Sequence, residues 1–213
     1  AGMTTKELDK IAYDYITSCG AKPSFLGYGG FPAATCISID EQVVHGFPSD
    51  RIIEEDQIVS VDVGAYFNGF HGDAARSLYV GHISPEKKKL IDVTRECFFE
   101  GIKGICIGSA LGDIGAQVQE HAEKNGFSVV RDMVGHGVGR NLHEDPSVPN
   151  YGRRGVGVRL KRNMTIAIEP MINMGGAGIR QLPDGWTVKT KDGRATENRP
   201  LITKTRCLSV TTE

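Results

Sequence analysis

The apolar residues of this chain follow two different spacings, and the change between them divides it into helices and strands. From Thr4 to Gly20 they recur every three or four positions, which is typical of an amphipathic helix. Thr4 followed by Glu7 has the form of a capping box, so the helix is expected to begin there. Two more helices are expected over residues 84–104 and 110–124, because N-cap signals precede the first and an Asn-Gly pair follows the second.

Short apolar stretches with glycine turns fill most of the remaining sequence. They read CISID, EQVVHGF, FSVVRDMVGHGVG, MTIAIEPMI, WTVKT and PLITKT. Such stretches are typical of short strands, and short turns between neighbouring strands favour antiparallel pairing. Helices interleaved with antiparallel strands, with no proline- or serine-rich break, predict an α+β fold in a single domain.

The stretch SVDVGAYFNGFHGDAA at 60–75 predicts a β-hairpin. Asn68-Gly69 is the pair that two-residue type I′ turns favour, and with this pair at the turn residue 64 lies opposite 73 and residue 62 opposite 75. Because side chains alternate between the two faces of a strand, Asp62 and Asp73 fall on the same face, about 7 to 8 Å apart as diagonal neighbours. Gly64, opposite Asp73, leaves space beside the pair.

These two carboxylates permit two interpretations. On an exposed hairpin face they would only be solvated side chains. Their neighbours in the hairpin are valine, alanine, phenylalanine and tyrosine, which favour burial. Buried carboxylates repel one another unless a counter-charge is present, and two divalent cations about 3.5 to 4 Å apart could be spanned by such a pair.

Other residues that bind cations or move protons occur outside the hairpin. The stretch GHGVGRNLHEDP at 135–146 places His136 and His143 among glycines, where the backbone can approach a ligand closely. Glu169 ends an apolar strand in TIAIEP, on the face opposite to the isoleucines, and His45 precedes a glycine in VVHGFP. Each of these residues alone is more typical of a structural role than of a functional one.

Composition and charge exclude several classes of protein. Lysine plus arginine, 25, nearly balances aspartate plus glutamate, 26, so nothing favours a nucleic acid or an anionic membrane as partner. The run EKKK at 86–89 is expected on a solvated helix face, the alternative being a weak contact with a polyanion such as the ribosome. His82 and His121 are expected at the surface. No transmembrane stretch or signal peptide is expected, and five cysteines without CxxC pairs indicate a reducing cytoplasm.

Taken together, these stretches resemble the type I methionine aminopeptidases, metal-dependent enzymes of the pita-bread fold. The matching segments are CISIDEQVVHGFP, VDVGAYFNGFHGDAAR, GHGVGRNLHEDP, IEPM and DGWTVKTKDG, in the family's order, and they extend over Gly2 to Gly193. The resemblance implies an α+β fold in which helices cover an antiparallel sheet. It also implies one metallo-aminopeptidase domain over 1–213, apparently lacking the family's usual extra N-terminal helix.

The resemblance implies a site for two divalent metal ions, cobalt, manganese, iron or zinc. The implied ligands are Asp62, Asp73, His136, Glu169 and Glu197, with Asp73 and Glu197 bridging. Glu197 is the family's glutamate after DGWTVKT, although the segment before it is about three residues shorter than the family's and Arg199-Pro200 follow it.

The resemblance also implies roles in substrate binding and catalysis. His45 and His143 would contact the substrate around the scissile bond, with Glu169 moving the proton. A pocket for the methionine side chain would be formed by Tyr28, Phe31, Cys36 and Trp186, with Phe25 and Leu142 in further pocket positions.

The implied activity is removal of the initiator methionine from nascent proteins and peptides when the second residue is small. A cytoplasmic monomer with at most transient ribosome contact is expected. Two alternatives remain: a proline-directed aminopeptidase of the same fold, and a peptide- or ribosome-binding protein of that fold with impaired catalysis.

Overall fold

The computed structural model describes residues 1–198 and 201–204. Its first helix, α1 (Thr5–Ser18), begins with the predicted capping box, in which Thr4 and Glu7 satisfy each other's backbone N–H groups. This helix packs against β1 (Lys22–Pro23) and β2 (Thr35–Ile39). Its apolar face is only partly covered, because Ile16 is buried whereas Tyr15 is exposed.

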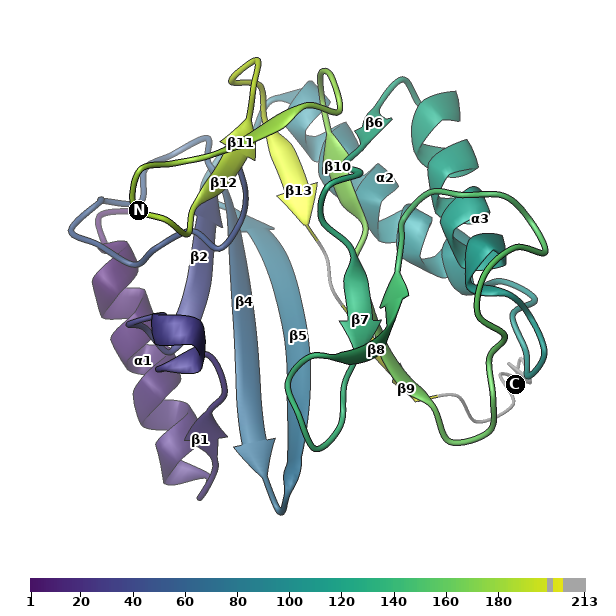
Figure 1. Ribbon diagram of the computed structural model, residues 1–213. Coiled ribbons are helices and arrows are strands. Elements are labelled where there is room, and N and C mark those ends of the chain that lie inside the picture. The colour runs from purple at the N-terminus through teal and green to yellow at the C-terminus, as the bar shows by residue number, and fades with distance from the viewer. Residues whose placement is uncertain (199–200, 205–213) are drawn as a thin grey trace, which may run out of the picture.

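The long hairpin of β4 (Ile58–Phe67) and β5 (Phe70–Tyr79) runs through the middle of the molecule (Figure 1). Its register confirms the prediction: Gly64 pairs with Asp73 and Asp62 with Ala75. Positive φ angles of 50° at Asn68 and 86° at Gly69 form the turn that the sequence predicts. Strands β1 and β2 pair with β4 and complete the first sheet.

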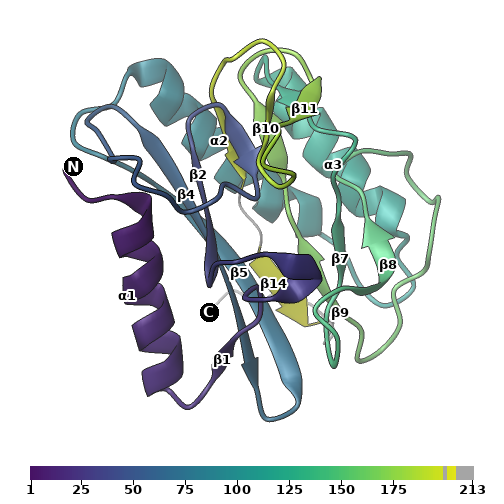
Figure 2. The same cartoon turned by 60° about the vertical axis from the view of Figure 1, so that its left-hand side comes forward.

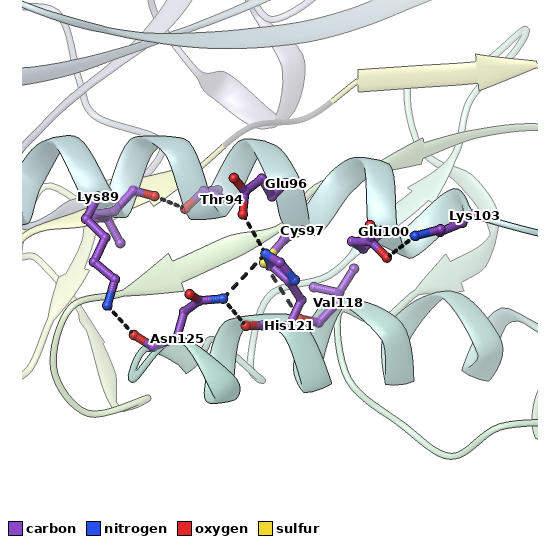
Figure 3. A network of polar contacts seen from close by, with 10 residues as sticks. Lys89, Thr94, Glu96, Cys97, Glu100, Lys103, Val118, His121 and Asn125 are labelled. Atoms are coloured by element: carbon purple, nitrogen blue, oxygen red, sulfur yellow. Dashed lines mark hydrogen bonds and ion pairs between the residues drawn. The ribbon is translucent and has the colours of Figure 1, made fainter. Parts of the chain in front are cut away.

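Helices α2 (Pro85–Ile102) and α3 (Leu111–Lys124) form a second layer. Both begin and end close to the predicted positions, and Ser84 caps α2 by accepting from the Lys87 N–H. Between them lies a largely apolar contact with one polar network, in which His121 pairs with Glu96 at 2.9 Å (Figure 3). His121 is therefore half-buried between two helices rather than a free surface residue, whereas His82 is exposed as expected.

The remaining strands are short and antiparallel. A 3₁₀ turn (Tyr28–Gly30) precedes β2, and β3 (Gln42–Val44) follows it. The later strands are β6 (Ser128–Val129), β7 (Gly135–Gly137), β8 (Glu144–Val148), β9 (Thr165–Ile168), β10 (Met171–Asn173), β11 (Ile179–Gln181), β12 (Val188–Thr190), β13 (Thr196–Asn198) and β14 (Leu201–Lys204). They form three small sheets, in the orders β13-β10-β6, β11-β12-β3 and β14-β9-β7-β8.

Helix α1 and the α2–α3 pair lie to either side of the β4–β5 hairpin, as both views show (Figures 1 and 2). The largest apolar core joins α2 and α3 to the inner faces of β6, β9 and β10. Ile166 and Ile168 of β9 point into this core, as the alternation of TIAIEP predicts. The other face of β9 and β10 is therefore turned toward the hairpin.

Candidate metal centre

A cavity of about 200 Å³ opens between the β4–β5 hairpin and the strands of the second half. It brings together every residue that the sequence analysis assigned to the site except Glu197. The lining residues are Phe25, Tyr28, Phe31, Cys36, Val44, His45, Asp62, Asp73, Met133, Val134, His136, Leu142, His143, Glu169, Met171 and Trp186.

Four polar side chains from four strands of two sheets converge at one end of this cavity. Asp62 and Asp73 come from β4 and β5 and His136 from β7, and Glu169 directly follows β9. His136 Nε2 lies 3.2 Å from Glu169 Oε1 and 3.5 Å from Asp73 Oδ2. On the other side of the ring, His136 Nδ1 lies 2.8 Å from the carbonyl oxygen of Gly137. A proton on Nδ1 would be held by that carbonyl, which leaves Nε2 as the nitrogen turned to the carboxylates.

The acidic groups are held in an environment that disfavours their charges. Burial, followed by the charges of Asp73 and Glu169, raises the pKa of Asp62 well above its ordinary value. Burial likewise raises the pKa of Glu169, with His136 acting in the opposite direction. For His136, burial lowers the pKa, but hydrogen bonds to Asp73 and Glu169 outweigh it and raise the value to about 10. A single imidazolium thus offsets only part of the charge of three carboxylates.

The chemistry of this cluster fits a divalent cation. Asp62 Oδ1 and Asp73 Oδ1 are buried and have no hydrogen-bond partner among the described residues. Buried carboxylate oxygens are costly unless a donor or cation satisfies them. Within residues 1–198 and 201–204 no three side chains of metal-binding type have a coordination geometry already formed, and the four groups pair with one another instead. Oxygen and imidazole donors suit first-row divalent ions.

Two further histidines face the cluster from the cavity. His143 Nδ1 lies 2.8 Å from the Tyr28 hydroxyl, and the His143 ring is 4.1 Å from that of His136, centroid to centroid. Burial, then the nearby charge of His136, lowers the pKa of His143 to about 4. Burial also lowers the pKa of His45, whose positive φ of 56° is rare for a residue with a side chain. Both rings are therefore neutral near pH 7.

The remaining wall of the cavity is apolar. Phe25, Phe31, Ala33, Cys36 and Leu142 form a small buried cluster of their own, against which Trp186 packs. Phe31 meets the Trp186 ring edge-on at a centroid distance of 5.1 Å. The space beside Asp73 is used by this wall, because a Cβ on Gly64 would stand 2.5 Å from Cε1 of Phe25.

Glu197 does not join the cluster. On β13 it pairs in register with Ile172, which belongs to the core under α2, and the side chain is 1% exposed. Its charge helps to raise the pKa of Cys97 on α2, to about 12, after the larger effect of burial. The next residue, Asn198, pairs with Met171, which lines the cavity. In the structure the expected fifth ligand is thus on the opposite face of its strand.

Sequence reasoning missed several residues near the cavity. Val44, Met133, Val134 and Met171 line it but are apolar residues with no distinctive motif. His71 was likewise not predicted to have a role near the cavity. Its Nδ1 lies 2.8 Å from Ser24 Oγ and its backbone N–H donates to the Gly139 carbonyl, so it ties the hairpin to two loops that enclose the cavity. Its position two residues before Asp73, on the same face of β5, was the available signal.

An apolar cavity with hard donors at one end, between two antiparallel halves covered by helices, is the arrangement of the pita-bread metallopeptidases. The sequence agrees, since residues 1–198 match metallopeptidase family M24, and the chain belongs to that family.

The chain is also similar to individual proteins of known sequence and structure. The chain is 54% identical over 193 residues to the methionine aminopeptidase of Clostridium perfringens, covering 91% of this chain and 78% of the relative. The crystal structure of methionine aminopeptidase from Rickettsia prowazekii superposes with a TM-score of 0.94 at 41% identity, covering 95% of this chain and 82% of that one. The predicted family and fold are thereby confirmed.

The proline-directed branch of the fold is more distant. An X-Pro aminopeptidase from Thermotoga maritima has a TM-score of 0.72 at 20% identity, and the match covers 95% of this chain but 50% of that chain. This likeness shows a shared fold alone. The alternative of a proline-directed aminopeptidase is therefore not favoured.

Proposed function

We propose that this chain removes the N-terminal methionine from peptides and nascent proteins whose second residue is small, by metal-assisted hydrolysis of the first peptide bond. The observation that carries the proposal is the meeting of Asp62, Asp73, His136 and Glu169 at one end of an apolar cavity. The likeness to methionine aminopeptidases over most of the chain supports the choice of substrate.

The four converging side chains are the proposed metal ligands. Carboxylate and imidazole donors suit Mn(II), Fe(II), Co(II) or Zn(II) better than a thiolate-type structural zinc. A divalent cation supplies Lewis acidity that polarises a peptide carbonyl and favours deprotonation of water. Glu197, which a two-ion arrangement with five ligands requires, faces α2 instead, so four residues carry this assignment.

The remaining polar residues act on the substrate. Neutral His143 accepts a hydrogen bond from the Tyr28 hydroxyl at Nδ1, so its Nε2–H is free to stabilise negative charge developing on the carbonyl oxygen. His45 forms a hydrogen bond with the peptide group, and the Glu169 carboxylate takes a proton from the attacking water and transfers it to the leaving amine. The backbone carbonyl of Glu169 accepts from Asn150 Nδ2, which fixes the position of this residue.

The apolar end of the cavity binds the methionine side chain. Phe31, Trp186 and Cys36 offer aromatic and sulfur surfaces, with which a thioether makes favourable contacts. Tyr28, Phe25 and Leu142 complete the wall. A cavity of about 200 Å³ is small, which favours one side chain of moderate length rather than a long peptide.

The cellular setting is part of the proposal. We place the protein in the cytoplasm as a monomer that meets nascent chains with at most a transient ribosome contact. Four cysteines of the described residues are free, which fits a reducing compartment. No helix in the described part of the chain is long and apolar enough to cross a membrane.

Release of methionine from a Met-Ala-Ser peptide tests the activity. With added Mn(II) or Co(II) the parent chain should turn over, and Asp73→Ala should lower kcat/KM by at least about a hundredfold, since even residues that support metal ligands are worth 10- to 100-fold. Asp14→Ala, an exposed aspartate on α1 paired with Lys10, is the matched control and should retain full activity. Cleavage of X-Pro but not Met-Ala peptides would favour the proline-directed alternative, and no metal-dependent turnover would leave a peptide-binding protein.

A further inference from the structure

The direction of Glu197 bears on how many cations the centre can hold. β13 lies between the β4–β5 hairpin and β10, with α2 on its far side (Figure 1). Its position is fixed from both neighbours. Ser60 Oγ and Ser77 Oγ of the hairpin donate to the Asn198 carbonyl at 3.0 and 3.1 Å, and Thr196 Oγ1 donates to the Ile172 carbonyl of β10 at 3.0 Å. A twist of the strand that turned Glu197 to the cavity would break these bonds.

Side-chain alternation then decides which residue of β13 faces the cavity. Asn198 is in register with Met171, a cavity residue, and Glu197 is in register with Ile172, a residue of the helix-layer core. The strand therefore directs its carboxylate toward Cys97 of α2, and Asn198 lies on the opposite face, the face of Met171, without itself lining the cavity.

The four remaining donors are enough for one ion. His136 Nε2 lies within 3.5 Å of both Asp73 and Glu169, and Asp62 makes a side-chain contact with Asp73, so the four side chains form one contiguous cluster. Protein metal centres use three or four protein ligands for each ion. Two ions with three ligands each need six coordinating contacts. Four side chains supply six contacts only if two of the side chains bind both ions. Without Glu197, a second ion would have to share these same four side chains.

We propose that this chain binds a single divalent cation at the Asp62–Asp73–His136–Glu169 cluster, and that Glu197 serves the contact between β13 and α2. This inference rests on the proposed function, since it concerns the same centre. It differs from the two-ion site that the family resemblance implies.

Counting bound Mn(II) tests the inference without relying on activity. The full chain is freed of metal with a chelator and brought to equilibrium with Mn(II) by dialysis, and the bound ion is measured per chain, with electron paramagnetic resonance to detect coupling between neighbouring ions. The expected result is one Mn(II) at saturation and no spin coupling. Two coupled ions would overturn the inference and leave the proposed function standing, whereas no bound ion would overturn both.

Two variants of β13 test which of its residues determine the number of bound Mn(II) ions. Glu197→Gln should leave the number of bound ions and their affinity unchanged, because the side chain faces α2. Asn198→Glu places a carboxylate on the cavity face and should raise the count from one ion to two, with Asn198→Gln as the control of matched size. Loss of an ion in Glu197→Gln, or a count that stays at one in a folded Asn198→Glu chain, would contradict the assignment. If Asn198→Glu fails to fold, the parent and Glu197→Gln counts still decide.

Discussion

Asp62, a proposed metal ligand, lies where burial disfavours its charge. Burial raises its pKa, with the neighbouring charges of Asp73 and Glu169 adding to the effect. In the metal-free chain burial favours the protonated form of this carboxyl, so its contribution to stability is fully present below the unfolded pKa of about 3.9. Its contribution to stability is lost as the pH rises through the raised folded pKa.

Asp62→Asn should therefore stabilise the metal-free chain near pH 7 by about 1 kcal/mol, the scale of single stabilising substitutions. The reason is that the amide removes one charge from a crowded, partly buried cluster. Urea unfolding at pH 5 and pH 8 provides the measurement, and the advantage of the variant should be larger at pH 8. An equal or lower stability of Asp62→Asn at pH 8 would contradict the account.

Added metal should reverse the order of stability of the parent and Asp62→Asn chains. A ligand that binds only the folded state stabilises it by about 2.7 kcal/mol at a hundred times its Kd. Parent protein with excess Mn(II) should gain this stability, and Asp62→Asn, with a neutral amide in place of a carboxylate, should gain less. The Asp14→Ala surface variant serves as control and should respond to Mn(II) as the parent does.

At the level of elements, His71 links three pieces of the chain. Its ring meets Ser24 Oγ at 2.8 Å, next to the cavity residue Phe25, and its backbone N–H donates to Gly139 in the loop that follows β7. The hairpin that carries Asp73 is thereby joined to the two loops that enclose the methionine end of the cavity.

Loss of this link should weaken substrate binding more than the chemical step. His71→Phe and Ser24→Ala are each expected to raise KM for Met-Ala-Ser by about three- to tenfold with a smaller change in kcat, since one hydrogen bond contributes about 1 kcal/mol. The double variant should be no worse than the single ones, because both remove the same bond. Additive effects in this cycle would show that the two residues act independently, and exposed His82→Phe is the control.

The elements differ in how far the sequence could predict them. The register of the β4–β5 hairpin followed from Asn68-Gly69 alone, since the turn and the alternation of side chains fix it locally. The face of β13 could not be predicted in this way. The direction of its side chains depends on contacts with Ser60, Ser77 and β10, which are distant in the sequence. Because the segment before Glu197 is about three residues shorter than in the family, the resemblance could not fix the direction of Glu197 either.

The same contrast holds for the candidate site. Aspartate, histidine and glutamate in recognisable stretches could be assigned from sequence because their chemistry restricts their roles. Val44 and Met133 could not, since an apolar residue at a cavity wall has the same local pattern as one in a core. Only the packing of the two halves against each other distinguishes these positions.

For the whole molecule, the apolar residues fall into separate clusters. The core beneath α2 and α3, which includes fully buried Leu90, is distinct from the small cluster around Phe31 at the cavity. Stability from the helix layer and selectivity in the cavity therefore depend on different contacts.

Leu90→Ala should lower the free energy of unfolding by about 2 to 5 kcal/mol, the usual cost of such a cavity in a core. Affinity for Mn(II) and kcat/KM at low temperature should stay within about twofold, because additive, independent behaviour is expected of sites without shared contacts. Urea unfolding and methionine release measure the two effects. A large loss of activity in the folded variant would show that the helix layer helps to shape the cavity.

The burial of Cys36 in the cavity wall has a practical consequence. Burial, then the charges of Asp62 and Asp73, raises the pKa of its thiol well above the ordinary value, so the reactive thiolate is scarce. Cys97 is buried as well, whereas Cys19 and Cys106 are exposed. Among these four described cysteines, a maleimide dye or spin label should therefore attach at the end of α1 and before α3, and report on the molecule from outside while the substrate cavity stays chemically untouched.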